Sequence, residues 1–332
     1  MQDIYIIGGS NSLLSGGWVA NLRAGYSDKF KITNLSIGAA TTLIGIYRIL
    51  CDEVPDGATV VWEYALNESN HRNAGQSLQS LMWHFGWFME LAHRRSLHVL
   101  PVVIWTRPEH VKLKHNDYRA AVTEKIDRLG LNCIDAWDPM IAFAEGRQVP
   151  VSDLYLDDMH YAPQGGFPAA LANLIAAAIS TARIPDAQPE YLGKSLRLCT
   201  PSGPASEVFE NSLFSADVHH LADPLHVEGK GHLLASYVIA ANDAGALTVS
   251  IGHSLFEVYS LQGAPGYRDP GRLLKHVVHW QTTDDIGFVA DNMVLSGDDP
   301  EGKPKVQNMF SWRGPLKDKM RQDGYICSLL EV

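Results

Sequence analysis

The first half of the chain alternates short apolar runs with longer amphipathic stretches. The apolar runs predict strands at residues 4–8, 31–36, 59–64, 98–105 and 131–135. The stretches between them predict helices at residues 13–24, 43–51, 74–95 and 116–129. The strand runs are continuously hydrophobic, which suits parallel strands covered on both faces by helices. This βαβ rhythm predicts an α/β fold, a three-layer, flavodoxin-like α/β/α sandwich that binds ligands at the carboxyl ends of its strands.

The second half of the chain has a different pattern. An alanine-rich helix is predicted at residues 167–182, and residues 183–190 are interpreted as a linker because two prolines interrupt the helical pattern. Strand-length runs separated by turns follow, at residues 232–241, 246–251, 255–261, 274–281, 286–294 and 325–330. We therefore expect an α/β domain at residues 1–185 and an all-β, jelly-roll-like sandwich at residues 192–332.

Composition and charge narrow the class of protein. The 332 residues exceed a usual single core, which stops growing near about 250–300 residues. Apolar residues make up 46% of the chain and charged residues 19%, which is typical of a globular protein. The formal net charge of -10 disfavours nucleic acid as a partner. No apolar stretch reaches the roughly 20 residues that span a bilayer, so no membrane association is expected.

Cysteine usage and the amino-terminal segment indicate a compartment. Cys51, Cys133, Cys199 and Cys327 are widely spaced and give no sign of a disulfide framework. Met1 leads directly into the first predicted strand, without the features of a signal peptide. A cytoplasmic location is therefore expected, whereas the sequence predicts no oligomeric state.

The first predicted strand ends in the segment Gly8-Gly9-Ser10-Asn11-Ser12. A serine at the carboxyl end of a strand and ahead of a helix exposes its hydroxyl where negative charge is stabilised. Ser10 is therefore a candidate nucleophile, although a tight turn or a helix cap explains the same residues. A phosphate-binding loop is disfavoured because the Lys-Ser/Thr pair of that motif is missing.

Two further strand ends carry residues that could stabilise a developing oxyanion. Gly38 follows the second predicted strand, where a glycine lets the backbone N–H approach a ligand closely. Asn67 follows the third and could donate through its side-chain amide. Taken alone, the first is a loop glycine and the second a helix-capping asparagine.

The last candidate element is the segment Asp157-Asp158-Met159-His160. An aspartate and a histidine three residues apart in a short loop can place the carboxylate against one ring nitrogen while the other nitrogen faces a serine. Such a carboxylate fixes the tautomer of the ring and stabilises its charged form. A solvated acidic loop on the surface gives the same pattern.

Together the four elements resemble the SGNH (GDSL-like) hydrolases, over about residues 1–183. Gly8-Gly9-Ser10 stands where that family has Gly-Asp-Ser, Gly38 where it has its second-block glycine, Ala65-Leu66-Asn67-Glu68 where it has Gly-x-Asn-Asp, and Asp157 to His160 where it has Asp-x-x-His. The chain departs from the family pattern at Gly9, which replaces the aspartate, and at Ala65 and Glu68 around the asparagine.

The resemblance implies a role for each of these residues. Ser10 would be the nucleophile, His160 the base and Asp157 the carboxylate that orients it. The backbone N–H groups of Ser10 and Gly38 and the side chain of Asn67 would form the oxyanion hole. The resemblance implies no metal and no organic cofactor.

Two neighbouring residues are rival candidates. Ser12 could be the nucleophile in place of Ser10, and Asp158 could be the orienting carboxylate in place of Asp157. The family spacing favours Ser10 and Asp157.

Other patterns have simpler explanations. The histidine-rich stretch at residues 219–232 matches no standard spacing of metal ligands. The aromatic block at residues 83–89 fits burial within a helix, although some of its rings could line an acyl pocket. The Gly/Pro-rich segment 263–272 is interpreted as a solvated loop that could also cover an active site.

These patterns lead to three hypotheses for function. The favoured one is a serine esterase that hydrolyses a carboxylic ester, with an O-acetyl or related acyl ester on a carbohydrate as substrate. The second is an acyltransferase that passes the acyl group to a sugar hydroxyl with the same three side chains. The third is a glycan-binding protein that keeps the fold with weak catalysis. The carbohydrate part depends on the second domain, because many sugar-binding modules are jelly rolls.

Overall fold

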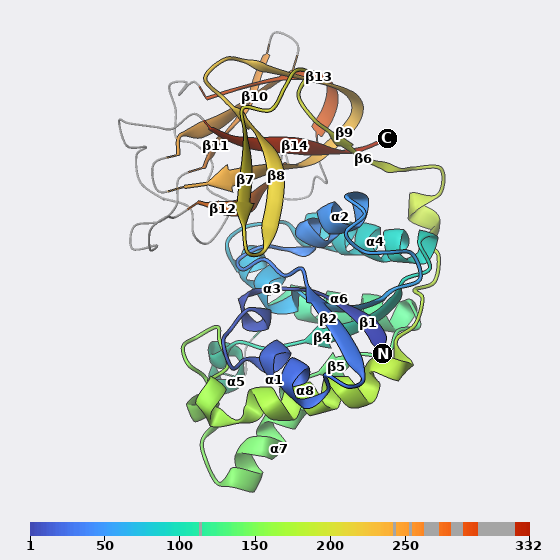
Figure 1. Cartoon of the computed structure of the whole chain (residues 1–332), viewed down its shortest axis with the longest axis vertical. Coiled ribbons are helices and arrows are strands. Elements are labelled where there is room, and N and C mark those ends of the chain that lie inside the picture. Colours follow the sequence, from blue (N-terminus) through green and yellow to red (C-terminus); the bar gives the residue numbers. More distant parts are fainter. Residues whose placement is uncertain (113–114, 242–243, 252–253, 262–271, 280–287, 298–322) are drawn as a thin grey trace. The chain divides into compact units, whose positions relative to one another are not determined.

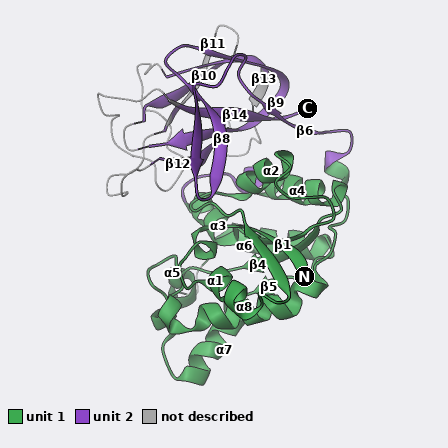
Figure 2. Cartoon of the chain, in the orientation of Figure 1, with its two compact units in different colours: residues 1–73, 81–190 green, residues 74–80, 191–332 purple. Residues whose placement is uncertain are grey.

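The computed structural model describes the chain except for residues 113–114, 242–243, 252–253, 262–271, 280–287 and 298–322. The chain divides into two compact units (Figure 2), one of residues 1–73 and 81–190 and the other of residues 74–80 and 191–332. Each unit has a hydrophobic core of its own.

A five-stranded parallel sheet forms the centre of the first unit (Figure 1). Its strands are β1 (Gln2–Gly8), β2 (Phe30–Asn34), β3 (Thr59–Glu63), β4 (His98–Val103) and β5 (Ile134–Asp135). Their order is β2-β1-β3-β4-β5, and every neighbouring pair is parallel. Each strand predicted from the apolar runs overlaps one of these strands. β3 is buried along its whole length, as expected for a strand covered on both faces.

Helices cover both faces of this sheet. They are α1 (Trp18–Gly25), α2 (Thr42–Leu50), α3 (Ala65–Asn73), α4 (Leu78–Arg94), α5 (Arg107–Lys112), α6 (Asp117–Arg128), α7 (Trp137–Arg147) and α8 (Phe167–Ala178). Ile6 of β1 belongs to the core cluster that contains side chains of α1 and α8. A Cβ on Gly45 of α2 would instead meet Ile7 and Phe88 of α4. Since adjacent strand residues point to opposite faces, α1 and α8 cover one face and α2 and α4 the other, which confirms the three-layer prediction.

The helix boundaries differ from the prediction in several places. The helix expected at residues 13–24 begins only at Trp18, because Gly16 adopts a φ of +74° and Gly17 is extended ahead of α1. The stretch at residues 74–95 is helical only from Leu78. Helices α3, α5 and α7 were not predicted. The sequence of α3, ALNESNHRN, has few apolar residues and therefore gives no amphipathic signal.

The second unit is an antiparallel β domain, which confirms the all-β prediction. Its described strands are β6 (Leu196–Cys199), β7 (Glu207–Asn211), β8 (Phe214–His220), β9 (Leu225–Ala240), β10 (Ala246–Ile251), β11 (Ser254–Ser260), β12 (Leu273–Val278), β13 (Phe288–Ser296) and β14 (Asp323–Glu331). They form one connected sheet in the order β11-β10-β13-β9-β14-β8-β7, with β12 added to β9 and β6 added to β14. Strands β6, β7 and β8 were not predicted.

The long strand β9 pairs with two different strands along its length. Its residues 225–233 pair with β13, and its residues 235–240 pair with β12. β14 pairs with β9 over residues 232–238 and also with β6 and β8. β9 is therefore a central strand of the sheet, with β12, β13 and β14 as its neighbours.

Two further expectations concern the surface. The predicted loop at residues 263–272 lies outside the described residues, apart from Arg272, whose guanidinium pairs with Glu207. In the described ranges, no helix has both the length and the apolar character needed to cross a membrane.

Candidate active site

Three neighbouring strands end at the candidate site. Ser10 begins a short 3₁₀ helix (Ser10–Ser12) after β1, Gly38 lies in the loop after β2, and Asn67 lies in the first turn of α3 after β3. Because β1 lies between β2 and β3, all three residues reach the carboxyl edge of the sheet. A Cβ added to Gly38 would lie 3.4 Å from the Ser10 Cβ. A Cβ added to Gly9 would lie 3.0 Å from Nδ2 of Asn67. The structure thus brings the three predicted residues together.

A chain of hydrogen bonds joins Ser10, His160 and Asp157. The Ser10 Oγ lies 2.7 Å from His160 Nε2, although the two residues are 150 positions apart. On the other side of the ring, His160 Nδ1 lies 2.8 Å from Asp157 Oδ2 and 3.0 Å from Oδ1. A carboxylate can only accept, so Nδ1 carries the proton and Nε2 is free to accept from the serine hydroxyl.

The carboxyl of Asp157 is held in its charged form. Partial burial works against the charge, but hydrogen bonds from the His160 ring and from the backbone N–H groups of Met159 and His160 outweigh it. The pKa of Asp157 is therefore lower than its usual value. This carboxylate can orient the ring and stabilise a charged imidazolium.

The two rival residues have other partners. Ser12 is buried and donates its hydroxyl to Glu63 Oε2 at 2.8 Å. Asp158 forms an ion pair with the guanidinium of Arg107, whose Nε lies 2.9 Å from Oδ1. Neither side chain belongs to the hydrogen-bonded chain through His160.

Gly9, one departure from the family pattern, lies close to the side chain of Asn67. A Cβ at Gly9 would lie 2.4 Å from the Asn67 Oδ1, far inside van der Waals contact. An aspartate at this position would therefore require the Asn67 side chain to shift. Asn67 is buried, and among the described residues its side chain has no hydrogen-bond partner. The amide is thus available to a ligand beside Ser10.

The loop that carries Gly38 contacts Tyr64, the residue after β3, and has an unusual backbone conformation. The Tyr64 hydroxyl lies 3.3 Å from both the backbone N and the backbone O of Ile37. Ala39, the residue after Gly38, is buried and has a φ of +50°, in the left-handed region that residues with a Cβ rarely adopt. Such conformations cost about 1 kcal/mol or more and gather at functional sites.

Glu63 is a buried carboxyl that contacts the turn carrying Ser10. Its Oε2 accepts hydrogen bonds from the Gly9 backbone N–H at 3.2 Å and from the Ser12 hydroxyl at 2.8 Å. Burial raises the pKa of this carboxyl to about 8 against the opposing effect of these hydrogen bonds. Glu63 therefore holds the turn mainly as a neutral acid near pH 7.

Glu68, the second departure near Asn67, has a structural role. Its Oε1 accepts from the backbone N–H of Thr42 at 2.8 Å, at the first turn of α2, and Oε2 accepts from the Tyr118 hydroxyl. Burial raises the pKa of Glu68 to about 7. The side chain ties α3, which carries Asn67, to α2 and α6.

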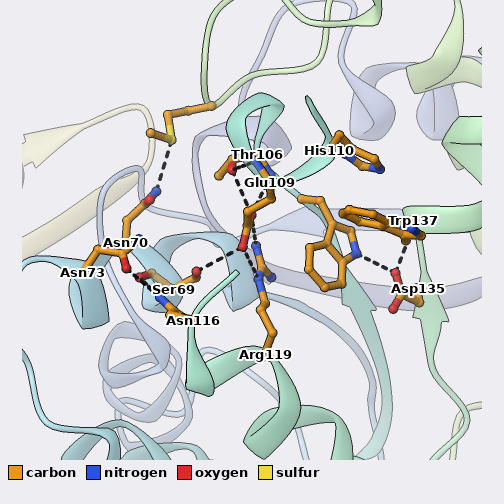
Figure 3. A network of polar contacts seen from close by, with 12 residues as sticks. Ser69, Asn70, Asn73, Thr106, Glu109, His110, Asn116, Arg119, Asp135 and Trp137 are labelled. Carbon is orange, nitrogen blue, oxygen red and sulfur yellow. Dashed lines mark hydrogen bonds and ion pairs between the residues drawn. The ribbon is translucent and has the colours of Figure 1, made fainter. Parts of the chain in front are cut away.

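A polar network that the sequence did not predict supports the same region (Figure 3). The Glu109 carboxylate of α5 accepts from Arg119 Nε and Nη2 at 2.9 and 2.8 Å, and from the backbone N and the Oγ1 of Thr106, both at 2.9 Å. The Asn70 Nδ2 of α3 donates to the Sδ of Met159 at 3.2 Å. The Asn70–Met159 contact joins residues 89 positions apart, so no local sequence signal could have revealed it.

Two further sequence patterns, the histidine-rich stretch and the aromatic block, were candidates for a metal site and an acyl pocket. In the part of the chain that the structure describes, no three His, Cys, Asp or Glu side chains gather as a metal ion would require. The aromatic block of α4 is largely buried, and Phe85 packs edge-on against Trp62 with ring centroids 4.8 Å apart. Packing in the core accounts for these rings.

Comparison with solved structures finds a similar fold that includes both units. No family model matches the chain, and no curated protein matches its sequence. The chain is similar to a two-domain esterase active on acetylated mannans, with a TM-score of 0.60 and 11% identity over 99% of this chain and 91% of the other. A structure of such an esterase with mannopentaose gives a TM-score of 0.62 and 11% identity, over 99% and 90%. This chain therefore has the two-domain fold of these esterases, a parallel α/β domain followed by an antiparallel β domain.

Proposed function

We propose that this protein is a serine esterase that hydrolyses a carboxylic ester with Ser10 as nucleophile, His160 as base and Asp157 as orienting carboxylate. One observation carries the proposal: the continuous chain of hydrogen bonds from the Ser10 hydroxyl through His160 to Asp157. It lies at the carboxyl edge of a parallel sheet, where α/β proteins bind their ligands.

The reaction follows from the two ring nitrogens of His160. The Ser10 Oγ attacks the ester carbonyl while its proton passes to His160 Nε2, and Asp157 stabilises the charged ring. The ring then returns this proton to the alcohol oxygen as the C–O bond breaks and an acyl-serine forms. Water attacks the acyl-serine in the same way, so the net products are the carboxylic acid and the alcohol with Ser10 restored.

Negative charge on the carbonyl oxygen would be stabilised beside Ser10. The donors we assign are the backbone N–H groups of Ser10 and Gly38 and the Nδ2–H of Asn67. The close approach of Gly38 to Ser10 and the unengaged Asn67 amide support this assignment. Fixed donors of this kind act strongly because they need no reorganisation as the charge develops.

A carbohydrate ester, such as an O-acetyl sugar, is the substrate class we favour. The support is the similarity of fold to a two-domain esterase active on acetylated mannans, which extends over nearly the whole chain. The same three side chains could pass the acyl group to a sugar hydroxyl instead of water, so acyl transfer is tested alongside hydrolysis.

The first test compares wild type, Ser10→Ala and Ser12→Ala. We expect wild type to hydrolyse p-nitrophenyl acetate and to be labelled by a fluorophosphonate at Ser10, and Ser10→Ala to lose the label and at least about 10⁴-fold in kcat. Ser12→Ala is the matched control: it removes the neighbouring hydroxyl but should keep the label at Ser10. Acetylated mannan, with and without an acceptor oligosaccharide, then tests the substrate class.

The outcomes separate the hypotheses. Labelling at Ser12 would contradict the assignment of the nucleophile. Acetyl groups appearing on the acceptor sugar, with little free acetate, would indicate an acyltransferase. If wild type and Ser10→Ala are equally slow and unlabelled, the esterase proposal is wrong and glycan binding becomes the function to measure.

A further inference from the structure

Asn11, the residue after Ser10, reaches the loop that carries His160. Its side chain is buried, with 3% of its surface exposed. Its Nδ2 donates to the backbone carbonyl of Met159 at 2.9 Å, and its Oδ1 accepts from the backbone N–H of Tyr161 at 3.0 Å. One amide therefore contacts the main chain immediately before and immediately after His160.

These two contacts complete the hydrogen bonding of the peptide groups on either side of His160. In the preceding peptide, the Met159 carbonyl accepts from Asn11 and the His160 N–H donates to Asp157 Oδ1 at 2.8 Å. In the following peptide, the His160 carbonyl accepts from the Leu156 N–H at 2.8 Å and the Tyr161 N–H donates to Asn11. The Cα of His160 is thus fixed between two peptide planes, and Asn11 anchors both of them.

We propose that Asn11 is a positioning residue that fixes His160 relative to Ser10. Asn11 adjoins the nucleophile in the sequence, so the same short 3₁₀ helix that presents the Ser10 hydroxyl also sets the place of the His160 main chain. This proposal rests on the function proposed above for Ser10 and His160. The hydrogen bonds of the Asn11 side chain go to the main chain on either side of His160, whereas the Ser10 hydroxyl bonds the His160 ring.

A side-chain amide of this length offers a donor to one peptide group and an acceptor to the other at every pH. An ionised carboxylate in its place could still accept from the Tyr161 N–H, but it would set a second acceptor against the Met159 carbonyl. A protonated carboxyl could donate again. Substitution by aspartate therefore changes one hydrogen bond and almost no volume, and lowering the pH should restore that bond.

The test compares kcat and KM for p-nitrophenyl acetate in wild type, Asn11→Asp and Asn132→Asp across pH. Asn132 is a matched control because its Nδ2 also donates to a backbone carbonyl, that of Thr181 at 2.8 Å, away from the candidate site. We expect Asn11→Asp to lose about 10- to 100-fold in kcat at pH 9, where the introduced carboxyl is ionised, with little change in KM, because misplacement of a catalytic group by about 1 Å can cost about 10²-fold.

The pH profile adds a signature that loss of folding would not give. Burial favours the neutral form of the introduced carboxyl, so the activity of Asn11→Asp relative to wild type should rise as the pH falls. A constant ratio across pH, or a kcat within about twofold of wild type at pH 9, would overturn the proposal. If Asn11→Asp does not fold, Asn11→Ala replaces it: its side chain has neither a donor nor an acceptor, and a wild-type kcat would again overturn the proposal.

A spectroscopic measurement separates this proposal from the proposed function. The proton that His160 Nδ1 shares with Asp157 should give a far-downfield NMR resonance in wild type and in Asn132→Asp. We expect the signal to shift or broaden in Asn11→Asp even if the protein hydrolyses no ester. An unchanged signal in Asn11→Asp counts against the positioning role, whereas absence of esterase activity in wild type counts only against the proposed function.

Discussion

Both domains contain a serine hydroxyl within hydrogen-bond distance of a histidine Nε2. In the α/β domain, the Ser10 Oγ lies 2.7 Å from His160 Nε2. In the β domain, the Ser236 Oγ lies 2.9 Å from His279 Nε2. Judged by this distance alone, the two pairs are nearly equivalent, so the difference between them must come from their surroundings.

The two histidines differ in the partner of the second ring nitrogen. His160 Nδ1 contacts the Asp157 carboxylate, whereas His279 Nδ1 lies 2.9 Å from the hydroxyl of Tyr259. A carboxylate stabilises a ring that has taken a proton, whereas a buried neutral phenol provides no opposite charge. Of the two rings, only that of His160 has a carboxylate beside it to stabilise an added proton.

Access differs as well. Ser236 and His279 have no exposed surface, and the Ser236 hydroxyl also lies 3.0 Å from the Ser328 hydroxyl inside the sheet. Ser10 and His160 are partly exposed. A Ser–His hydrogen bond is therefore a poor predictor of catalysis unless a carboxylate and an approach for the substrate accompany it.

Replacing each histidine by alanine tests this comparison most strongly. We expect His160→Ala to lower kcat at least about 10⁴-fold with a small effect on unfolding. His279→Ala should keep the activity but destabilise the β domain by about 2 kcal/mol, because it leaves the buried Tyr259 hydroxyl without this partner. Esterase kinetics and urea unfolding of both variants measure the two effects. An equal loss of activity in both variants would show that the comparison is wrong.

The role of the carboxylate beside His160 can be tested with two adjacent aspartates of one loop. Asp157→Asn removes the charge beside His160 and should lower kcat by about 10³- to 10⁴-fold near neutral pH. Asp158→Asn changes the adjacent carboxylate, which pairs with Arg107 on a half-exposed surface, and should cost about tenfold or less. If Asp158→Asn proves the more damaging change, the assignment of the orienting carboxylate must be reversed.

A smaller effect concerns the buried carboxyl of Glu63. The unfolded chain loses this proton near pH 4.5, whereas the folded protein keeps it until about pH 8. The stabilising contribution of the neutral carboxyl is thus complete below about pH 4.5 and is lost as the pH rises through about 8. Glu63→Gln is neutral at every pH, so it should not lose this contribution. Its free energy of unfolding minus that of wild type should therefore rise by roughly 2–4 kcal/mol from pH 5 to pH 9. Urea unfolding curves at both pH values provide the measurement, and a constant difference between the proteins would contradict the expected ionisation.

Much of the architecture follows from local pattern. The apolar runs predict strands that overlap all five strands of the parallel sheet. The signal is clearest for β3 and β4, which are buried along almost their whole length. The candidate residues after those strands follow from the same reasoning, since parallel strands share one carboxyl edge. The hydrogen bonds among Ser10, His160 and Asp157 agree with the arrangement expected from the sequence.

The missed features depend on contacts between distant residues. Asn11 and Glu63 have no distinctive local pattern, and each acquires its role only when a remote segment packs against it. Helix α3 is nearly all polar in sequence, but in the fold it is held through Glu68 and Ser69. Strands β7 and β8 form a hairpin with many polar positions, and their pattern resembles that of a loop.

The place of β14 in the sheet has a consequence for how the chain is made. The ribosome adds about 5–20 residues per second and releases the amino-terminal part first, so the α/β domain can fold while the rest is still being synthesised. The β domain cannot follow in the same gradual way, because β14 (Asp323–Glu331) pairs with β9, β8 and β6, which are all translated earlier. Until β14 is translated, those strands lack a central neighbour and expose unpaired edges, which are sites for aggregation. A nascent chain that stalls before Asp323 should therefore carry a folded first domain and a second domain that depends on chaperones.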